Sequence, residues 1–305
     1  MMNDRNQTQT IGCADAPSHG GLTKPAPVSA VVPCFRCAAT IDDAVASIAA
    51  QTLPPAEVLL VDDASGDDTL EALHRVAENY PAGWIKVIAL PTNGGVSRAR
   101  NTGWEHARQP YIALLDADDT WAEPHKLELQ MAALEADTAI ALIAHKALVG
   151  RRGTALPALQ PPVHVEIVGR RTLLLRNPFP TSSVVLRRDL PFRFDEEFRN
   201  SQDYLLWSQI VFSGYRCAKI DQVLALWTER GNGDAAGLSD DFAAVQRARS
   251  RLRRKLLREG LLSRMEYVFA STVGLMTRTR RSLVLRLRKR RPYRTRAPAS
   301  QLRRP

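Results

Sequence analysis

The chain has few of the features that mark secreted, membrane-spanning or repetitive proteins. Its 305 residues include only four cysteines, and no apolar run reaches the roughly 18 residues of a membrane-spanning helix. Residues 1–27 are polar and lack the apolar segment of a signal peptide. No internal repeat is apparent. These absences argue against a disulfide-stapled secreted domain and against a transmembrane protein, so we expect a cytoplasmic protein.

The composition that is present describes a globular protein. Apolar residues make up 45% and charged residues 24% of the chain, and its length allows one or two domains. Cys34 and Cys37 have the spacing of a redox or zinc pair, but no second close pair follows to complete a zinc site. We interpret these two cysteines as residues at the end of a strand.

The net charge of +10 is unevenly distributed. Residues 246–305 hold 20 Lys and Arg against two acids, whereas residues 1–245 hold 22 basic and 30 acidic residues. A basic segment of this kind indicates a polyanionic partner. Within residues 278–294 the arginines are mixed with four apolar residues, which suits a helix lying on an anionic membrane better than a nucleic-acid platform. We expect peripheral association with the inner face of the cytoplasmic membrane through residues 246–305 and no nucleic-acid partner; the alternative is a solvated or disordered tail.

Short apolar runs alternate with helical patterns through the first half of the chain. The runs are residues 28–33, 57–61, 85–90 and 111–115, and the segments between them carry apolar residues at helical spacing. This alternation predicts an α/β fold with a mostly parallel central sheet and helices on both faces. In open sheets of this type, ligands bind beyond the carboxyl ends of the strands.

The alternation weakens after about residue 150. Residues 182–186 have the pattern of a strand, residues 203–212 that of a short helix, and a long arginine-rich helical stretch is predicted from about 240 to 291. The chain therefore ends in a basic helical extension.

Three carboxylates follow the fourth apolar run: Asp116, Asp118 and Asp119. Clustered carboxylates repel one another and resist burial, and a divalent cation at the strand end would neutralise them. Hard oxygen ligands of this kind suit Mg²⁺ or Mn²⁺. An acidic turn without a ligand is the simpler interpretation, because Asp is common in turns.

Six motifs, in order along residues 28–230, resemble those of family 2 glycosyltransferases of the GT-A fold. They are Val28–Pro33, Leu59–Thr69, Asn93–Gly103, Leu114–Asp119, Thr181–Val185 and Phe194–Trp207. The resemblance implies an inverting, metal-dependent enzyme that transfers a sugar from a nucleotide-sugar to a hydroxyl of a glycan or lipid-linked acceptor. A UDP-sugar is the default donor, and members of this type build bacterial cell-surface polysaccharides.

The resemblance also implies roles for individual residues. Nucleotide-sugar binding falls to Pro33, Phe35, Asp62, Asp63, Asn93, Arg100 and Asp116; the Mn²⁺ or Mg²⁺ ion to Asp116 and Asp118; and the role of catalytic base to Asp203. We expect a disordered tail over residues 1–27, where the composition is polar, and the resemblance implies a GT-A catalytic domain over 28–240, divided into a nucleotide-sugar-binding half (28–150) and an acceptor half (151–240). The basic extension then covers residues 241–305.

Two departures from the family pattern concern the site. Gln202 precedes the base where a glutamate is usual, and no histidine follows Trp227–Arg230 where many relatives supply one toward the metal or diphosphate. A rival hypothesis is a phosphatase of the haloacid dehalogenase type, in which Asp116 would be the phosphorylated nucleophile. That nucleophile usually follows the first strand, whereas three predicted strands precede Asp116.

Overall fold

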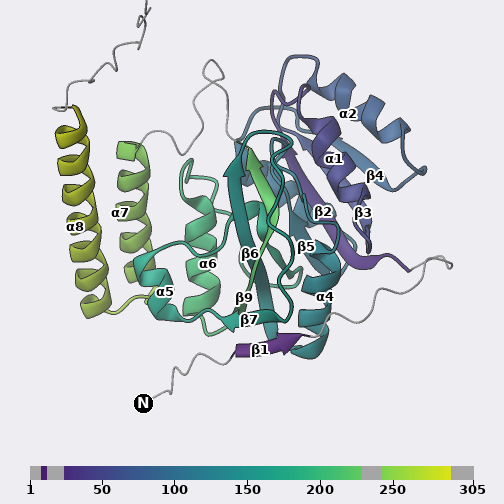
Figure 1. Ribbon diagram of the computed structural model, residues 1–305. Coiled ribbons are helices and arrows are strands. Elements are labelled where there is room, and N and C mark those ends of the chain that lie inside the picture. The colour runs from purple at the N-terminus through teal and green to yellow at the C-terminus, as the bar shows by residue number, and fades with distance from the viewer. Residues whose placement is uncertain (1–7, 12–23, 229–241, 290–305) are drawn as a thin grey trace, which may run out of the picture.

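The computed structural model describes residues 8–11, 24–228 and 242–289 (Figure 1). Its core is one nine-stranded sheet in the order β1-β7-β9-β6-β8-β5-β2-β3-β4. The strands are β1 (Thr8–Ile11), β2 (Ala26–Cys34), β3 (Pro55–Asp62), β4 (Ile85–Ala89), β5 (Tyr111–Leu114), β6 (Ile140–Gly150), β7 (Val163–Ile167), β8 (Val185–Arg187) and β9 (Arg216–Thr228). The helices are α1 (Ile41–Ala49), α2 (Thr69–Glu78), α3 (Val96–His106), α4 (Lys126–Ala136), α5 (Arg170–Leu175), α6 (Gln202–Phe212), α7 (Phe242–Arg258) and α8 (Arg264–Lys289), with a 3₁₀ turn, η1, at Thr181–Ser183.

The strand directions confirm the expected mostly parallel sheet. β2 pairs in parallel with β3 and β5, β3 with β4, and β6 with β9. β8 is antiparallel to both of its neighbours, β5 and β6, and β7 is antiparallel to β1 and β9. The strands that precede the expected site residues therefore end at the same edge of the sheet.

Two hydrophobic clusters cover the two faces of the sheet. α1, α2 and α4 pack on one face, where Ile48, Leu73 and Leu134 are fully buried. α3 and α6 pack on the other, where Trp104 and Leu206 are fully buried. Fully burying a side chain of this size contributes about 1.5–3 kcal/mol, so the clusters hold the helices firmly against the strands.

α3 approaches the sheet closely at a glycine. A Cβ placed on Gly103 would collide with Cγ1 of Val31 in the middle of β2. The absence of a side chain at Gly103 lets α3 lie directly on β2 and β3 and fixes the position of the arginine that the helix carries one turn earlier.

The structure corrects two expectations about the ends of the chain. Thr8–Ile11, inside the segment expected to be unstructured, pairs with β7 because that edge strand offers free backbone groups. The single helical stretch expected from 240 to 291 is two helices: α7 ends at a turn in which Gly260 adopts a φ of 71°, a left-handed conformation that favours glycine. The sequence pattern did not reveal β7, β9 or α5; the two strands belong to the second half of the sheet, and α5 follows β7.

Candidate functional site

The polar residues at the carboxyl ends of β3 and β5 form two groups. Asp62 is the last residue of β3 and Asp63 follows it, and Asp116 lies just beyond the end of β5. β2 lies between these strands, so Pro33 and Phe35 come between the two groups. Phe35 is 48% exposed, which leaves its ring accessible to a planar ligand.

Asp63 holds the turn that begins α3. Its Oδ1 accepts the backbone N–H of Gly94 at 2.8 Å, and its Oδ2 accepts that of Gly95 at 2.7 Å. Asn93 Nδ2 donates to the Asp63 backbone carbonyl at 2.9 Å, and Gly95 has a φ of 86°. Both carboxylate oxygens of Asp63 are thus engaged with the protein, and its side chain supports the 93–95 loop.

Asp62 is 4% exposed and accepts hydrogen bonds from the hydroxyl and the backbone N–H of Ser65. Ser65 Oγ in turn accepts the backbone N–H of Arg36 at 3.1 Å. The spacing of Ser65 and Asp68 suggests a capping box, but Ser65 instead joins the end of β3 to the loop after β2. This link holds the loop after β2 against the end of β3.

Arg100 of α3 contacts both Asp116, after β5, and Phe194, in the loop before α6. Its Nη2 lies 2.5 Å from Asp116 Oδ1, and its guanidinium lies 5.2 Å from the centre of the Phe194 ring. The arginine is 3% exposed, and Nε and Nη1 have no hydrogen-bond partner among the described residues. Buried donors without partners are costly, and a bound anion would satisfy them.

The loop after β5 is fixed through Ser182. Ser182 Oγ donates to Asp119 Oδ2 at 2.5 Å and accepts the backbone N–H of Asp116 at 3.2 Å. Asp119 Oδ1 accepts the backbone N–H of Thr228, at the end of β9, at 3.1 Å. Burial, and then the neighbouring charge of Asp116, raise the pKa of Asp119 to about 8. Asp119 therefore ties three segments together, a role that sequence reasoning missed although it counted the third carboxylate.

Asp203 lies in the first turn of α6, close enough to Arg100 and Asp116 for their charges to act on its pKa. Asn177 Nδ2 donates to its Oδ2 at 2.9 Å, and Thr181 Oγ1 lies 3.4 Å from the same oxygen. Desolvation raises the pKa of Asp203; the charge of Asp116 raises it further, and that of Arg100 lowers it. The structure thus brings Arg100, Asp116 and Asp203 within electrostatic reach. Asn177, which sequence reasoning also missed, orients the carboxylate.

Asp116 and Asp118 are the candidate metal ligands, and Asp116 Oδ1 also accepts a hydrogen bond from Arg100. Both are partly exposed, whereas Asp119 points to Ser182 and Thr228. The described residues contain no group of three or more His, Cys, Asp or Glu side chains that could hold an ion by themselves. Two carboxylates suit Mg²⁺ or Mn²⁺, which commonly take their remaining ligands from substrate phosphates and water. The donor set fits an ion that arrives with a diphosphate.

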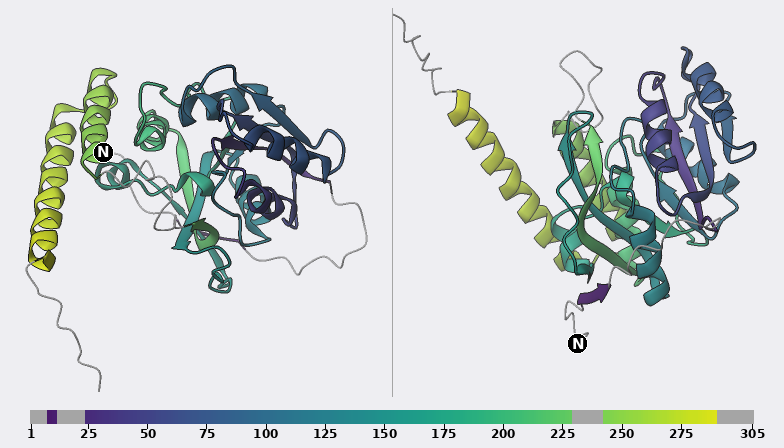
Figure 2. Two further views of the ribbon diagram at one scale, coloured as in Figure 1. Left: turned by 90° about the horizontal axis from the view of Figure 1, so that it is seen from above. Right: turned by 45° about the vertical axis from the view of Figure 1, so that its right-hand side comes forward.

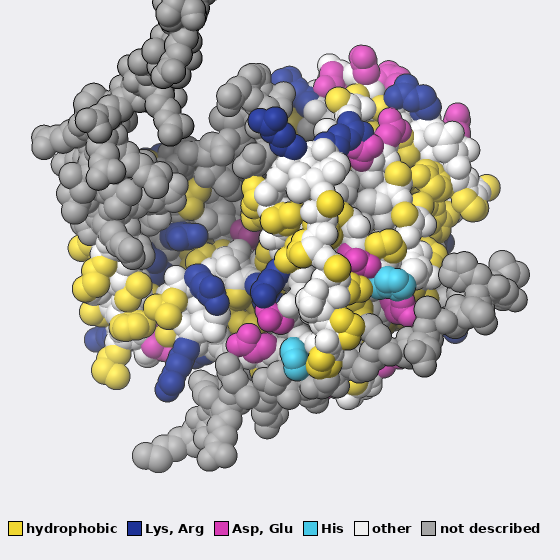
Figure 3. All heavy atoms as spheres, viewed as in Figure 1, with side chains coloured by type: hydrophobic (Ala, Val, Ile, Leu, Met, Phe, Trp, Pro, Cys, Tyr) yellow, Lys and Arg dark blue, Asp and Glu magenta, His cyan; other side chains and the backbone are white. Residues whose placement is uncertain are grey.

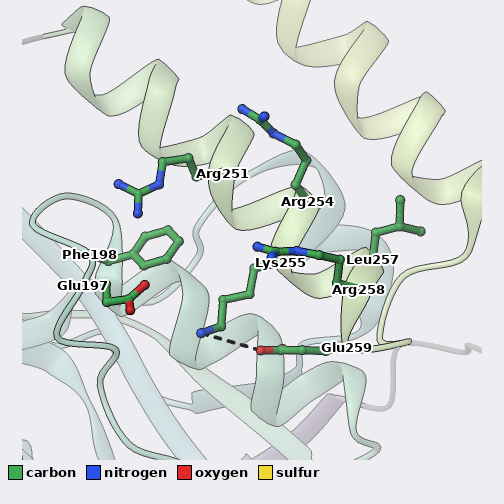
Figure 4. A pocket seen from close by; sticks show the side chains of 8 residues that line it. All are labelled: Glu197, Phe198, Arg251, Arg254, Lys255, Leu257, Arg258 and Glu259. Atoms are coloured by element: carbon green, nitrogen blue, oxygen red, sulfur yellow. Dashed lines mark ion pairs between the residues drawn. The ribbon is translucent and has the colours of Figure 1, made fainter.

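A separate cavity of about 750 Å³ lies along α7, away from these carboxylates (Figure 4). Arg251, Arg254, Lys255 and Arg258 line it from α7, and Glu197 and Phe198 from the loop before α6. It lacks the clustered carboxylates that lie at the strand edge.

The sequence model of glycosyl transferase family 2 matches residues 29–190. The glycosyltransferase EpsE of Bacillus subtilis is 30% identical over 216 residues, which cover 68% of this chain and 74% of that protein. WfgD of Escherichia coli, named as a UDP-Glc:α-D-GlcNAc-diphosphoundecaprenol β-1,3-glucosyltransferase, is 27% identical over 60% of this chain and 69% of that protein.

Solved structures share the fold. S. aureus TarS in complex with UDP-GlcNAc has a TM-score of 0.61 at 20% identity, over 81% of this chain and 70% of that one. The mannosyltransferase PcManGT of Pyrobaculum calidifontis, in complex with GDP-Man and Mn²⁺, has a TM-score of 0.56 at 20% identity, over 90% and 83%. With the family match spanning more than half of the chain, the protein belongs to glycosyl transferase family 2 and is a glycosyltransferase of the GT-A fold.

Proposed function

We propose that the protein is an inverting, metal-dependent glycosyltransferase that moves a sugar from a nucleotide-sugar to a hydroxyl group of its acceptor. The observation that carries this proposal is the convergence of Asp116, Arg100 and Asp203 from β5, α3 and α6 at one edge of the sheet. Direct displacement at a sugar carbon needs positive charge to hold the anionic donor and a base to take the proton of the acceptor hydroxyl.

Asp203 acts as the general base. An acceptor hydroxyl has a very high pKa and must lose its proton as it attacks, so a carboxylate within hydrogen-bond reach speeds the step. Asn177 holds the Asp203 carboxylate in place, and burial raises the pKa of Asp203, which makes it a stronger base. A single base opposite the leaving group gives one in-line displacement and an inverted product.

Asp116 and Asp118 would hold Mg²⁺ or Mn²⁺ against the donor diphosphate. Such an ion, when bound, stabilises the charge that develops on the leaving nucleoside diphosphate. Arg100 anchors Asp116, and its Nε and Nη1, which have no hydrogen-bond partner among the described residues, suit phosphate oxygens.

The donor and the acceptor are proposed by similarity of site and relatives. Pro33, Phe35, Asp62 and Asn93 would receive the nucleoside, with Asp63 supporting their loop. A UDP-sugar is the default donor, as in the TarS complex with UDP-GlcNAc. A glycan or a lipid-linked sugar is the proposed acceptor, in line with the name of WfgD, and cell-surface polysaccharide the product.

The proposed setting is the cytoplasm, on the inner face of the cytoplasmic membrane. None of the described helices is long and apolar enough to cross a bilayer.

The phosphatase hypothesis for Asp116 has no support from the comparisons, and β2, β3 and β4 all precede β5 in the chain.

Thermal unfolding of the purified chain with UDP, GDP and dTDP, each with and without Mn²⁺, tests the proposal. A ligand at 100 times its Kd, bound by the folded state alone, adds about 2.7 kcal/mol to the free energy of unfolding. We expect UDP to raise the melting temperature only when Mn²⁺ is present. No shift with any nucleotide, together with hydrolysis of a generic phosphate ester, would contradict the proposal.

A further inference from the structure

An apolar stripe runs along the outer face of α8. Nine large apolar side chains are exposed in the described part of the chain, and five belong to this helix: Met265, Val268, Phe269, Leu275 and Met276. Their spacing places all five on one side of the helix. Exposed Thr272 is the polar residue between them, and residues 267–277 contain no charge. Figure 3 shows hydrophobic side chains gathered at the lower left of the molecule, where the first turns of α8 lie in Figure 1.

The stripe faces outward because the opposite side of α8 is held. Ala270 is 3% exposed and faces the protein, and the guanidinium of Arg253 on α7 lies over Gly274. At the start of the helix, Glu266 Oε2 accepts Nη2 of Arg170 at 2.9 Å, and the same guanidinium stacks 4.4 Å from the centre of the Phe212 ring. A fixed helix with a contiguous apolar face is typical of an interaction surface.

The charge around the stripe selects the partner. Residues 278–289 of α8 hold six Lys and Arg and no acid, and α7 holds seven and no acid. An apolar stripe continued by arginines matches the interface of an anionic bilayer, where apolar side chains insert between headgroups that attract the cations. A second copy docked through α8 would bring two such basic segments together, which like-charge repulsion disfavours.

We propose that the α7–α8 hairpin docks the enzyme on an anionic membrane surface, with Met265, Val268, Phe269, Leu275 and Met276 as the inserted face. The sequence pattern predicts membrane association through residues 246–305, with the apolar residues of 278–294 as part of the contact; the described side chains add an apolar face at residues 265–276. The side chains of 277–289 lie outside the described part of the chain.

The hairpin also sets the orientation of the active site. Lys255 Nζ of α7 lies 2.5 Å from Asp195 Oδ2. Arg251 of α7 stacks 5.0 Å from the centre of the Phe198 ring (Figure 4). These contacts bind α7 to the loop that leads into α6 and Asp203. In both views of Figure 2, and in Figure 1, α8 lies at the end of the molecule opposite to α2 and β4. A docked enzyme therefore turns the Asp203 side toward the lipid and leaves the β3–β4 side in water. This consequence rests on the proposed function: a lipid-linked acceptor approaches Asp203 from the membrane, and the soluble nucleotide-sugar arrives from solution.

Vesicle co-sedimentation of the full chain tests the docking. The vesicles are phosphatidylcholine with or without phosphatidylglycerol, and no nucleotide is added, so the result is independent of catalysis. Val268→Asp is compared with Val149→Asp, a matched control because the two valines are 61% and 56% exposed on different elements. We expect binding to the phosphatidylglycerol vesicles alone, weakened about tenfold or more by Val268→Asp and unchanged by Val149→Asp.

Three results would overturn the proposal. They are no binding by the full chain, equal loss in both variants while both melt like the parent, and equal binding to neutral vesicles. Light scattering tests whether a second copy of the chain occupies the stripe instead. A parent chain that is dimeric, does not bind vesicles and becomes monomeric in Val268→Asp would assign the stripe to that second copy.

Discussion

Replacing Asp203 with asparagine is expected to remove catalysis and leave donor binding intact. Asparagine keeps an oxygen that can accept the 2.9 Å hydrogen bond from Asn177, so the local structure is retained. What it loses is a base, and a positioned general base contributes about 10²–10⁴-fold to a rate. This range equals about 3–5 kcal/mol of transition-state stabilisation.

The stability of this variant has a predicted sign. Burial raises the pKa of Asp203 in the folded state, so the folded protein binds a proton more tightly than the unfolded chain does. The carboxyl group therefore stabilises the fold at low pH, and this contribution is lost as the pH rises through the folded pKa. At pH 7 the variant should melt at the same temperature as the parent or higher, and its advantage should vanish toward pH 4.

The assay combines initial rates with melting curves. Rates are measured with the nucleotide-sugar whose diphosphate stabilises the parent, and melting is followed with that diphosphate and Mn²⁺. Asp189→Asn, in the exposed turn after β8, is the control for the same chemical change. If the variant keeps more than about a tenth of the parent rate, the loss is smaller than the range expected for a general base, and the role of Asp203 is refuted. A variant that loses the stabilisation by nucleotide would refute the separation of the two roles.

Three further changes probe the metal site, the core and the hairpin. Asp118→Ala should abolish the Mn²⁺-dependent part of the melting shift with nucleotide while the ligand-free melting temperature stays unchanged; an unaltered shift would remove Asp118 from the metal site. Lys126 is fully buried, its Nζ has no hydrogen-bond partner among the described residues, and burial sets its pKa well below the usual value. Lys126→Met should therefore raise the free energy of unfolding by about 1–3 kcal/mol at pH 7. This gain should shrink as the pH rises to the value at which a lysine in the unfolded chain loses its proton. Urea titrations of this variant and of the exposed control Lys86→Met measure the gain, and a loss of stability in Lys126→Met would contradict the prediction. Arg170 lowers the pKa of Glu266 from 4.5 to about 2. The parent should therefore be more stable than Glu266→Gln at neutral pH, by at most about 1 kcal/mol for this partly exposed pair. This difference should disappear as the pH falls from 4.5 to 2. Acid melting curves that stay apart below pH 2 would exclude this ion pair as the source.

The first half of the fold follows from local sequence patterns. β2, β3 and β5 are nearly continuous apolar runs because they are buried on both faces, and short helical segments with one apolar side separate them. Parallel strands joined in this way must end at a common edge, so the sequence predicted that Asp62 and Asp116 lie at the same edge of the sheet. Confirmation of the family supports this reading of the motifs, whereas the roles of the individual site residues stay predictions.

The second half depends on contacts between distant segments. The sequence pattern did not reveal β9, because it makes its backbone pairs with β6 and β7, and its end reaches Asp119 109 residues earlier in the chain. Spacing gives no sign that Ser182 joins Asp116 to Asp119, or that Asn177 holds Asp203, since each link crosses between elements that only the folded sheet brings together.

The basic extension shows the same division. Its charge and its helical character were evident from composition and periodicity, which are local properties. Which side of α8 is exposed was decided by tertiary packing, because Arg170, Glu266 and Ala270 fix the rotation of the helix and so determine that Val268 and Phe269 face outward.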